Sequence, residues 1–268
     1  MEENHIPLTF PALFYETVRK FGDHNAYAFV GEKPKTYIES AREISALTAL
    51  LEKLGIKPGD KVALLSLNCP NWSSAYFSIT FMGAVVVPIL PDFSATEVAN
   101  VLSHSEAKAI FISTSLLPRL EGYKSDDLKS AIIIEDFSIL FSEHKSPVFD
   151  PSAQPKKTYE VAEDDLASII YTSGTTGHSK GVMLTHRNIS FNASKGMVIQ
   201  SIDENDRFLS VLPLSHTYEN TLGLMLPMLG GACVYYLRKP PTPSVLIPAM
   251  AEFKPTVMLT VTFIIEKV

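Results

Sequence analysis

Residues 61–113 read KVALLSLNCPNWSSAYFSITFMGAVVVPILPDFSATEVANVLSHSEAKAIFIS, and this stretch decides the fold class. Three short apolar runs, KVALLSL, AVVVPI and AKAIFIS, alternate with two stretches of helical periodicity at 72–82 and 95–103. Continuous apolar runs are typical of strands buried on both faces, and strand–helix–strand order favours parallel pairing. The stretch therefore predicts an α/β fold of mostly parallel sheets flanked by helices.

The same alternation extends to both sides of this stretch. Residues 25–38 contain two β-prone runs around GEKPK, which predicts a hairpin, and a helical pattern follows as far as Leu54. Residues 142–165 are polar and contain prolines, which favours a loop or a linker. In the second half we expect a helix from His186 toward Val198 and strands at LASIIYTSG (166–174), 208–212, 232–237 and 256–260.

Composition narrows the class of protein. The chain has 268 residues, of which 46% are hydrophobic and 19% charged, so it can bury the core of one large or two ordinary domains. The net charge of −6 comes from interspersed acids and bases, without a basic stripe. We therefore expect a folded protein that does not bind nucleic acid.

The cysteines and the hydropathy of the sequence indicate the cellular compartment in which the protein is expected. Cys69 and Cys233, the only cysteines, lie far apart without a histidine cluster, so neither a disulfide framework nor a zinc site is predicted. The first residues, MEENHIPLTF, carry acids where a secretory signal has basic residues, and the most apolar stretch, 76–91, is shorter than the roughly 20 residues of a spanning helix. We expect a cytoplasmic protein without a transmembrane segment, and peripheral contact with a membrane stays open.

The segment YTSGTTGHSKG, residues 171–181, follows an apolar run and has the chemistry of a phosphate-binding loop. Glycines allow successive backbone N–H groups to converge on phosphate oxygens. Hydroxyl groups add hydrogen-bond donors, and a lysine adds a compact positive charge. The residues concerned are Gly174, Gly177, Gly181, Thr172, Ser173, Thr175, Thr176 and Lys180.

This segment is not a Walker A loop. That motif requires Gly-Lys followed by Ser or Thr five residues beyond its first glycine, and Ser179 and Val182 occupy the corresponding positions. A P-loop kinase or ATPase is therefore disfavoured. A flexible Ser/Thr/Gly connector would explain a shorter match of this kind.

YTSGTTGHSKG followed by VMLTHRNI resembles the phosphate-loop signature of the adenylate-forming superfamily, which includes acyl-CoA synthetases, luciferases and the adenylation domains of peptide synthetases. One departure is Ser179, where the family usually has proline. NCPNWSSAYFSITFMGAVVVPILP is similar to an early helix and strand of the family, and VLPLSHTYENTLG is similar to its next core motif. The whole chain, 1–268, thus resembles the N-terminal portion of the large adenylating domain.

The resemblance implies an activity and a set of site residues. In the family, a carboxylate attacks the α-phosphate of ATP, diphosphate leaves, and the acyl group passes from AMP to coenzyme A. It implies that His216 is a catalytic-site residue, that Thr172 is a ligand of Mg²⁺, and that Glu219 contacts the cofactor. The other implied ATP-binding residues are Thr172, Ser173, Gly174, Thr175, Thr176, Gly177 and Lys180. For Glu219, a solvated charge near the start of a helix is the alternative.

The substrate class is inferred from two motifs. LPLSHTYE and KPTVMLTVTFIIEKV resemble long-chain fatty acyl-CoA synthetases, although Thr262 stands where proline is expected. A medium-chain, aryl or amino acid is the alternative substrate. A non-catalytic nucleotide-binding or interaction protein is the alternative from another class.

The last residues, TVMLTVTFIIEKV, form an apolar run without a turn or a polar tail. We expect truncation here, with the rest of the adenylating domain and the C-terminal lid domain absent; a terminal strand within a sheet is the alternative. The family's motifs for adenine and ribose and its C-terminal catalytic lysine do not occur in the chain. We therefore expect the chain alone to be inactive and to dimerise through exposed strands near its C-terminal end.

Overall fold

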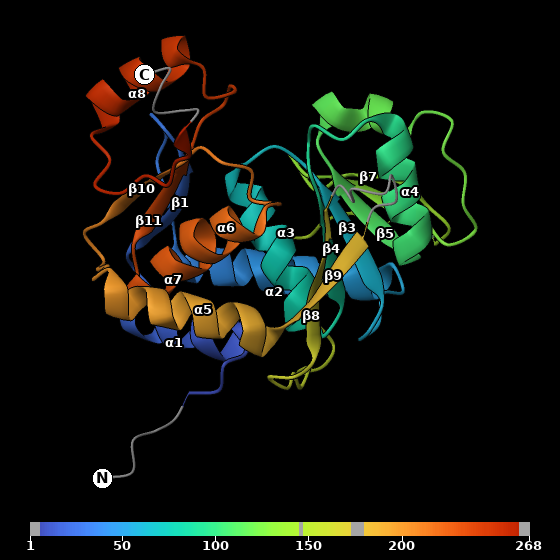
Figure 1. The fold of residues 1–268 in the computed structure, drawn as a ribbon. Helices are drawn as coiled ribbons and strands as arrows, with labels where there is room; N and C mark the ends of the chain where they lie inside the picture. Colours follow the sequence, from blue (N-terminus) through green and yellow to red (C-terminus); the bar gives the residue numbers. More distant parts are fainter. Residues whose placement is uncertain (1–5, 145–146, 173–179, 263–268) are drawn as a thin grey trace.

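The computed structural model describes residues 6–144, 147–172 and 180–262. Within these ranges the strands form two separate sheets, which stand side by side in Figure 1. The larger sheet contains, from edge to edge, β7 (Ile139–Ser142), β6 (Ser130–Ile133), β5 (Ala109–Ile112), β3 (Lys61–Leu65), β4 (Val85–Ile89), β8 (Leu166–Thr172) and β9 (Lys180–Thr185). The smaller sheet contains β10 (Arg207–Ser210), β11 (Cys233–Tyr236), β1 (Asn25–Phe29) and β2 (Lys35–Thr36).

Strand pairing is mostly parallel, as predicted. In the seven-stranded sheet, β6, β5, β3, β4 and β8 run parallel, and the edge strands β7 and β9 are antiparallel to their neighbours. In the four-stranded sheet, β10, β11 and β1 are parallel and β2 is antiparallel. The carboxyl ends of the parallel strands within a sheet therefore lie on one side of the molecule, which is where open α/β sheets bind ligands.

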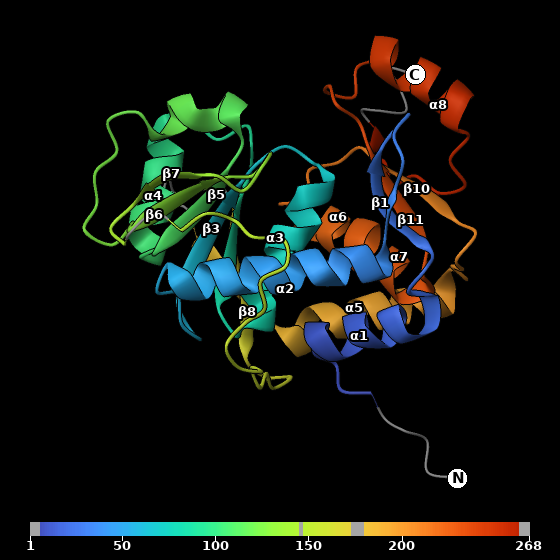
Figure 2. The same ribbon diagram turned by 180° about the vertical axis from the view of Figure 1, so that it is seen from behind.

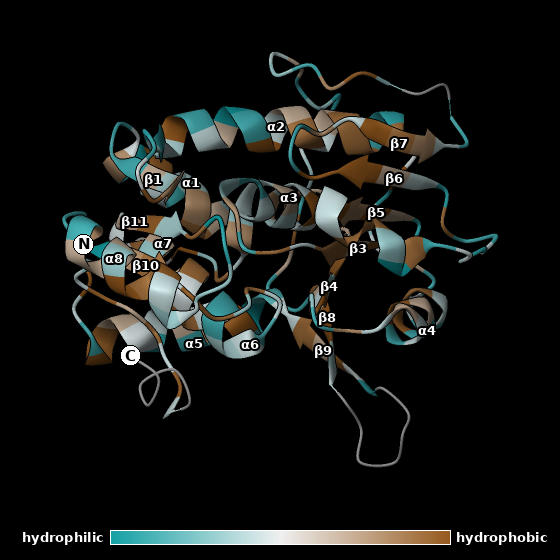
Figure 3. Cartoon of the chain, turned by 90° about the horizontal axis from the view of Figure 1, so that it is seen from above, coloured by the Kyte–Doolittle hydropathy of each residue, from teal (hydrophilic) through white to brown (hydrophobic). Residues whose placement is uncertain are grey.

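Helices fill the space between the sheets and cover their outer faces. The helices that contribute to the central core are α1 (Phe10–Phe21), α2 (Tyr37–Lys53), α3 (Pro70–Phe81), α5 (His186–Ile199) and α7 (Leu226–Gly230). Figure 2 shows α2 crossing from one sheet toward the other, and Figure 3 shows α3 between the two sets of strands. The outer elements are α4 (Ala95–Ser105) and the 3₁₀-helix η1 (Thr114–Leu120) on the larger sheet, and α8 (Pro243–Phe253) on the smaller one.

The core shows why the strands read as continuous apolar runs. Along β3, Val62 and Leu64 pack into the central core, whereas Ala63 and Leu65 pack into a second cluster under α4. Both faces of the strand are therefore buried, so polar alternation would place polar groups in one core or the other. Except for Asn71, every residue of α3 is buried, because this helix is enclosed between the sheets.

Helix starts are set by local side chains. Thr36 and Glu39 form a capping box at the start of α2, and Ser94 and Glu97 form one at the start of α4. Thr185 begins α5 in the same way, with an asparagine three residues later. Each box satisfies backbone N–H groups that have no partner within the helix, so these starts are fixed by the sequence itself.

Most of the predicted elements are confirmed. Helices α3 and α4 match the periodic stretches 72–82 and 95–103, and β1 pairs with β2 as the predicted hairpin. The described residues between β7 and β8 contain no helix or strand. This loop is not a linker between independent bodies, because Tyr159 Oη donates a hydrogen bond of 2.8 Å to Glu52 on α2.

The predicted strand 256–260 is wrong. Only Val257 pairs with the smaller sheet, through a single parallel bridge to Phe208. Thr256 Oγ1 accepts a hydrogen bond of 2.9 Å from Arg207 N, and the Val257 carbonyl accepts one of 3.0 Å from Leu209 N. No backbone hydrogen bond of the described residues 258–260 continues this ladder. The sequence reading also missed α1, α8 and the pairing of β9 with β8. The run 263–268 lies outside the described residues.

Candidate active site

The ends of the predicted phosphate loop lie on a β-hairpin. Strands β8 and β9 are antiparallel, and Thr172 and Lys180 are register partners at its last described pair. Both side chains are exposed. Thr172 and Lys180 are thus brought opposite each other, which periodicity alone did not predict. Ser173, Gly174, Thr175, Thr176 and Gly177 lie outside the described residues.

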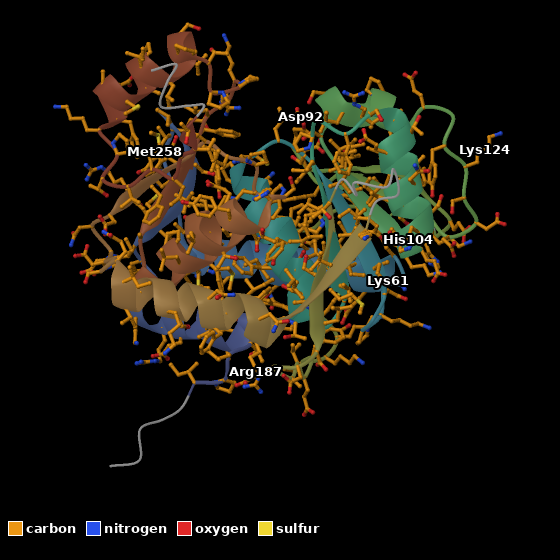
Figure 4. The ribbon with its side chains drawn as sticks, viewed as in Figure 1. Lys61, Asp92, His104, Lys124, Arg187 and Met258 are labelled. Atoms are coloured by element: carbon orange, nitrogen blue, oxygen red, sulfur yellow. The ribbon has the colours of Figure 1, made fainter. Side chains whose placement is uncertain are left out.

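The hairpin points to the side where the parallel strands end. Arg187 pairs with Asp164 just before β8 begins, and in Figure 4 Arg187 lies at the lower side of the molecule. Asp92, which follows β4, lies at the upper side in the same view. Because β8 runs parallel to β4, Thr172 is at the upper side. This is the edge at which the phosphate loop was expected.

Tyr171 anchors the hairpin below the loop. Its ring is buried, and its hydroxyl forms a hydrogen bond of 2.7 Å with Nδ1 of His104 in the last turn of α4. Across the hairpin it faces Gly181, where an added Cβ would lie 2.8 Å from Ile169 Cγ2 and 3.3 Å from Tyr171 Cζ. Gly181 is therefore required by the packing of the hairpin, whereas the sequence suggested only a phosphate-binding backbone.

His216 lies in a second segment of the site. It follows β10 and caps the short helix α6 (Thr217–Glu219), with its Nδ1 accepting a hydrogen bond of 3.3 Å from Tyr218 N. The imidazole is exposed, and Nε2 forms no hydrogen bond to another described residue. His216 is therefore available to a ligand.

Glu219 differs from its expected environment. Its side chain is 1% exposed, so the interpretation as a solvated cap charge is wrong. Oε1 accepts a hydrogen bond of 2.6 Å from Ser210 Oγ, and burial raises the pKa of the carboxyl to about 8. The helix continues as a π-helix, η2 (Asn220–Met225), a form often found at functional sites. Cofactor contact by Glu219 stays a prediction, since this carboxyl does not reach the surface here.

A cavity of about 560 Å³ opens between the carboxyl ends of both sheets. Ser66 and Ser113 line it just beyond β3 and β5, and Leu237 lines it beyond β11. None of the described residues predicted for the site lines this cavity. Asn68 connects the two regions: it lines the cavity, and its Oδ1 accepts a hydrogen bond of 2.9 Å from Leu214 N in the segment before His216. Asn68 belongs to the NCPNW segment, and nothing in the neighbouring sequence indicated that it would line the cavity and bind the segment before His216.

Two further properties of the described residues concern metal binding and membrane insertion. Across 6–144, 147–172 and 180–262, no group of three or more His, Cys, Asp or Glu side chains could hold a metal ion. A threonine hydroxyl at the edge of a phosphate loop nevertheless suits Mg²⁺, which prefers oxygen ligands and shares them with substrate phosphates. Thr172 as a metal ligand stays a prediction. In the described part of the chain no helix is long and apolar enough to cross a bilayer.

A family model described as AMP-binding enzyme matches residues 14–268. The chain belongs to this AMP-binding enzyme family. Its curated relatives are acyl-CoA ligases. It is 27% identical to the long-chain-fatty-acid–CoA ligase heimdall of Drosophila melanogaster, over 97% of this chain and 42% of that protein. It is 30% identical to the crotonobetaine/carnitine–CoA ligase of Shigella sonnei, over 76% of this chain and 41% of that protein.

Solved structures agree on the fold of this AMP-binding enzyme. A putative long-chain-fatty-acid CoA ligase from Rhodopseudomonas palustris has a TM-score of 0.80 at 23% identity, over 97% of this chain and 64% of that one. A benzoate CoA ligase from Burkholderia xenovorans has a TM-score of 0.83 at 23% identity, over 97% and 51%. The α/β fold is thus that of acyl-CoA synthetases. The chain spans less than half the length of the curated relatives named above.

Proposed function

We propose that the protein activates a carboxylic acid with ATP as part of an acyl-CoA ligase, and that the acid is a long-chain fatty acid. The observation that carries the proposal is the β8–β9 hairpin. It sets Thr172 and Lys180 opposite each other as register partners at the two ends of the SGTTGHS segment. A hydroxyl donor and a positive charge at the ends of a glycine-rich segment suit the β- and γ-phosphates of a nucleotide.

The chemistry explains why such a loop is needed. A carboxylate is a poor electrophile, so its oxygen first attacks the α-phosphate of ATP, and the bond to diphosphate breaks. The acyl-adenylate then has AMP as a leaving group, which the coenzyme A thiol displaces. Lys180 would stabilise the charge on the departing diphosphate, and His216 would line the reaction site. Mg²⁺, held with the help of Thr172, would shield the phosphate charges.

The fatty acid is the finer part of the proposal. LPLSHTYE around His216 favours it, and one relative is named a long-chain ligase. Another relative is named for crotonobetaine and carnitine, and a structural neighbour for benzoate. A medium-chain or aryl acid is therefore the alternative substrate. A non-catalytic nucleotide-binding or interaction protein is the alternative from another class.

The proposal also covers the domain to which the chain belongs, its cellular compartment, membrane contact and self-association. Residues 1–268 would form the first part of the adenylating domain, with the adenine, ribose and coenzyme A sites in further sequence. Cys69 and Cys233 are free thiols, as suits a reducing cytoplasm. Contact with a membrane surface, as a source of fatty acid, and self-association near the C-terminal end remain proposals.

ATP–diphosphate exchange tests the activity and the substrate class together. We expect the product of the complete gene to exchange label between diphosphate and ATP when palmitate is supplied. Diphosphate regenerates ATP by attacking the acyl-adenylate, and the acyl-adenylate forms only when a carboxylic acid is bound. Octanoate, benzoate and an amino acid serve as comparison substrates. Exchange with benzoate but not palmitate would replace the long-chain substrate, and no exchange with any acid would favour the non-catalytic alternative.

Lys180→Ala tests the role of the hairpin in the same assay. We expect about a hundredfold slower exchange, because the substitution removes a charge directed at the leaving phosphates. Lys124→Ala is the matched control, since Lys124 is exposed on a loop at the far side of α4 (Figure 4). Equal rates for the two variants would remove Lys180 from the mechanism.

A further inference from the structure

A chain of two hydrogen bonds, one partly buried and one buried, lies beneath the segment that carries His216. Asn68 Nδ2 donates to Ser210 Oγ at 3.0 Å, and Ser210 Oγ donates to Glu219 Oε1 at 2.6 Å. Asn68 follows β3 of the larger sheet, whereas Ser210 ends β10 of the smaller sheet. The chain therefore joins both sheets to the residue that lies three positions after His216.

Asn68 also fixes the segment itself. Its Nδ2 donates to the Leu212 carbonyl at 2.6 Å, and its Oδ1 accepts from Leu214 N at 2.9 Å. The backbone is thus held at two points before His216. Glu219 holds it at one point after His216, so the histidine lies on a turn that is anchored on both sides.

The carboxyl of Glu219 is packed as well as bonded. A Cβ on Gly223, one turn further along η2, would lie 2.6 Å from both Cδ and Oε1 of Glu219, so the carboxyl occupies the space that a side chain would take. Oε2 is buried and has no hydrogen-bond partner among the described residues. None of the ion pairs among these residues involves Glu219.

We propose that Glu219 is a positioning residue, which holds the His216 turn in place from below through Ser210 and Asn68 and acts as an uncharged carboxylic acid. A buried carboxylate without a cation would be strongly unfavourable, whereas the neutral acid can accept the Ser210 hydrogen bond at little cost. The effect on catalysis rests on the proposed function, in which His216 lines the reaction site. The effect on the position of His216 does not.

The test is histidine side-chain NMR on this chain, comparing Glu219→Gln and Glu219→Ala with Glu204→Ala. Glutamine keeps the carbonyl that accepts from Ser210 and carries no charge, so we expect the His216 resonances to stay in place. Alanine removes the hydrogen bond and leaves a cavity, so we expect these resonances to shift or broaden. Glu204 is an exposed acid in the turn before β10, so its variant should match the parent protein.

Two results would overturn the proposal. One is a folded Glu219→Ala protein with unchanged His216 resonances. The other is a folded Glu219→Gln protein as perturbed as the alanine variant, since that would require an ionised carboxylate. Should Glu219→Ala not fold, as judged by Trp72 fluorescence, Ser210→Ala replaces it. This substitution removes the donor to Oε1 and the acceptor of the Asn68 hydrogen bond but keeps the Glu219 side chain, so it should shift the same resonances to a smaller extent.

Kinetics on the complete enzyme separates positioning from direct ligand contact. Misplacement of a site residue by about 1 Å lowers the rate about a hundredfold, so we expect Glu219→Ala to lower kcat with little change in KM for ATP, and Glu219→Gln to restore it. A raised KM for ATP in both variants would instead make Glu219 a nucleotide ligand. If no enzyme activity is found, the NMR result still decides the positioning role.

Discussion

Two buried ionisable side chains give the stability of this protein opposite dependences on pH. His186 begins α5, where burial lowers its pKa to about 4, an effect that the nearby Asp165 partly opposes. Its neutral form is favoured in the fold, so its contribution is fully present above pH 6.5 and lost as pH falls toward 4. For Glu219 the neutral acid is favoured, so its contribution is fully present below pH 4.5 and lost as pH rises through 8.

Between pH 6.5 and 8 the Glu219 contribution falls, and comparison with Glu219→Gln separates it from the contributions of other groups. We expect the free energy of unfolding of the parent protein, relative to Glu219→Gln, to fall by about 2 kcal/mol over this interval, because glutamine has no proton to lose. Urea denaturation at the two pH values measures the difference. A constant difference would show that the carboxyl is already ionised, or already solvated, at pH 6.5.

At the scale of elements, the β8–β9 hairpin depends on the absence of a side chain at Gly181. A Cβ added to Gly181 would lie 2.8 Å from Ile169 Cγ2. Ile169 is on β8, and the other neighbour of β8 is β4, which cannot move without disturbing the buried sheet. We expect Gly181→Ala to destabilise the protein by about 1–3 kcal/mol in urea denaturation, as overpacking does.

Val182→Ala is the matched control for this prediction. Val182 is the next residue of β9 and is 45% exposed, so its truncation should change stability by no more than about 0.5 kcal/mol. Equal effects of the two substitutions would show that β9 tolerates a side chain at position 181. In that case the glycine serves the approach of a ligand, as its position in the phosphate-loop motif suggests.

At the scale of the whole molecule, the two sheets share one core. Trp72, the only tryptophan, is fully buried on α3 in that core and stacks on Tyr76 with ring centroids 5.1 Å apart. Tyr76 Oη donates to Asn220 Oδ1, and Ser73 Oγ is 3.0 Å from Tyr236 Oη, so α3 is bonded to elements of the smaller sheet and the His216 region.

Because of this shared core we expect both sheets to unfold together. Trp72 fluorescence, which reports on the space between the sheets, and far-UV circular dichroism, which reports on all secondary structure, should give coincident urea transitions. Two separated transitions would show instead that the sheets are independent domains. Trp72→Phe, which keeps an aromatic side chain, checks by circular dichroism that the reporter itself does not set the midpoint.

The sequence alone determined the features that depend on near neighbours. Parallel strands buried on both faces must be apolar throughout, so 61–113 was sufficient to predict β3, α3, β4, α4 and β5. The glycines, hydroxyl groups and lysine of the phosphate loop are adjacent in the chain, so their chemistry could be inferred without a fold. Motif resemblance supplied His216, which the structure places at the surface.

Only the tertiary structure decided which distant segments meet. Nothing local indicates that β1 pairs with β11, about two hundred residues later, and so that the strands divide into two sheets. Likewise, Glu219 is polar and follows a histidine at the start of a helix, so its sequence context suggested solvent. The fold buries it beside Ser210, which ends β10 and donates to it, and near Asn68, which follows β3 and donates to Ser210. Burial and long-range hydrogen bonds depend on the assembled fold, and local periodicity carries no record of them.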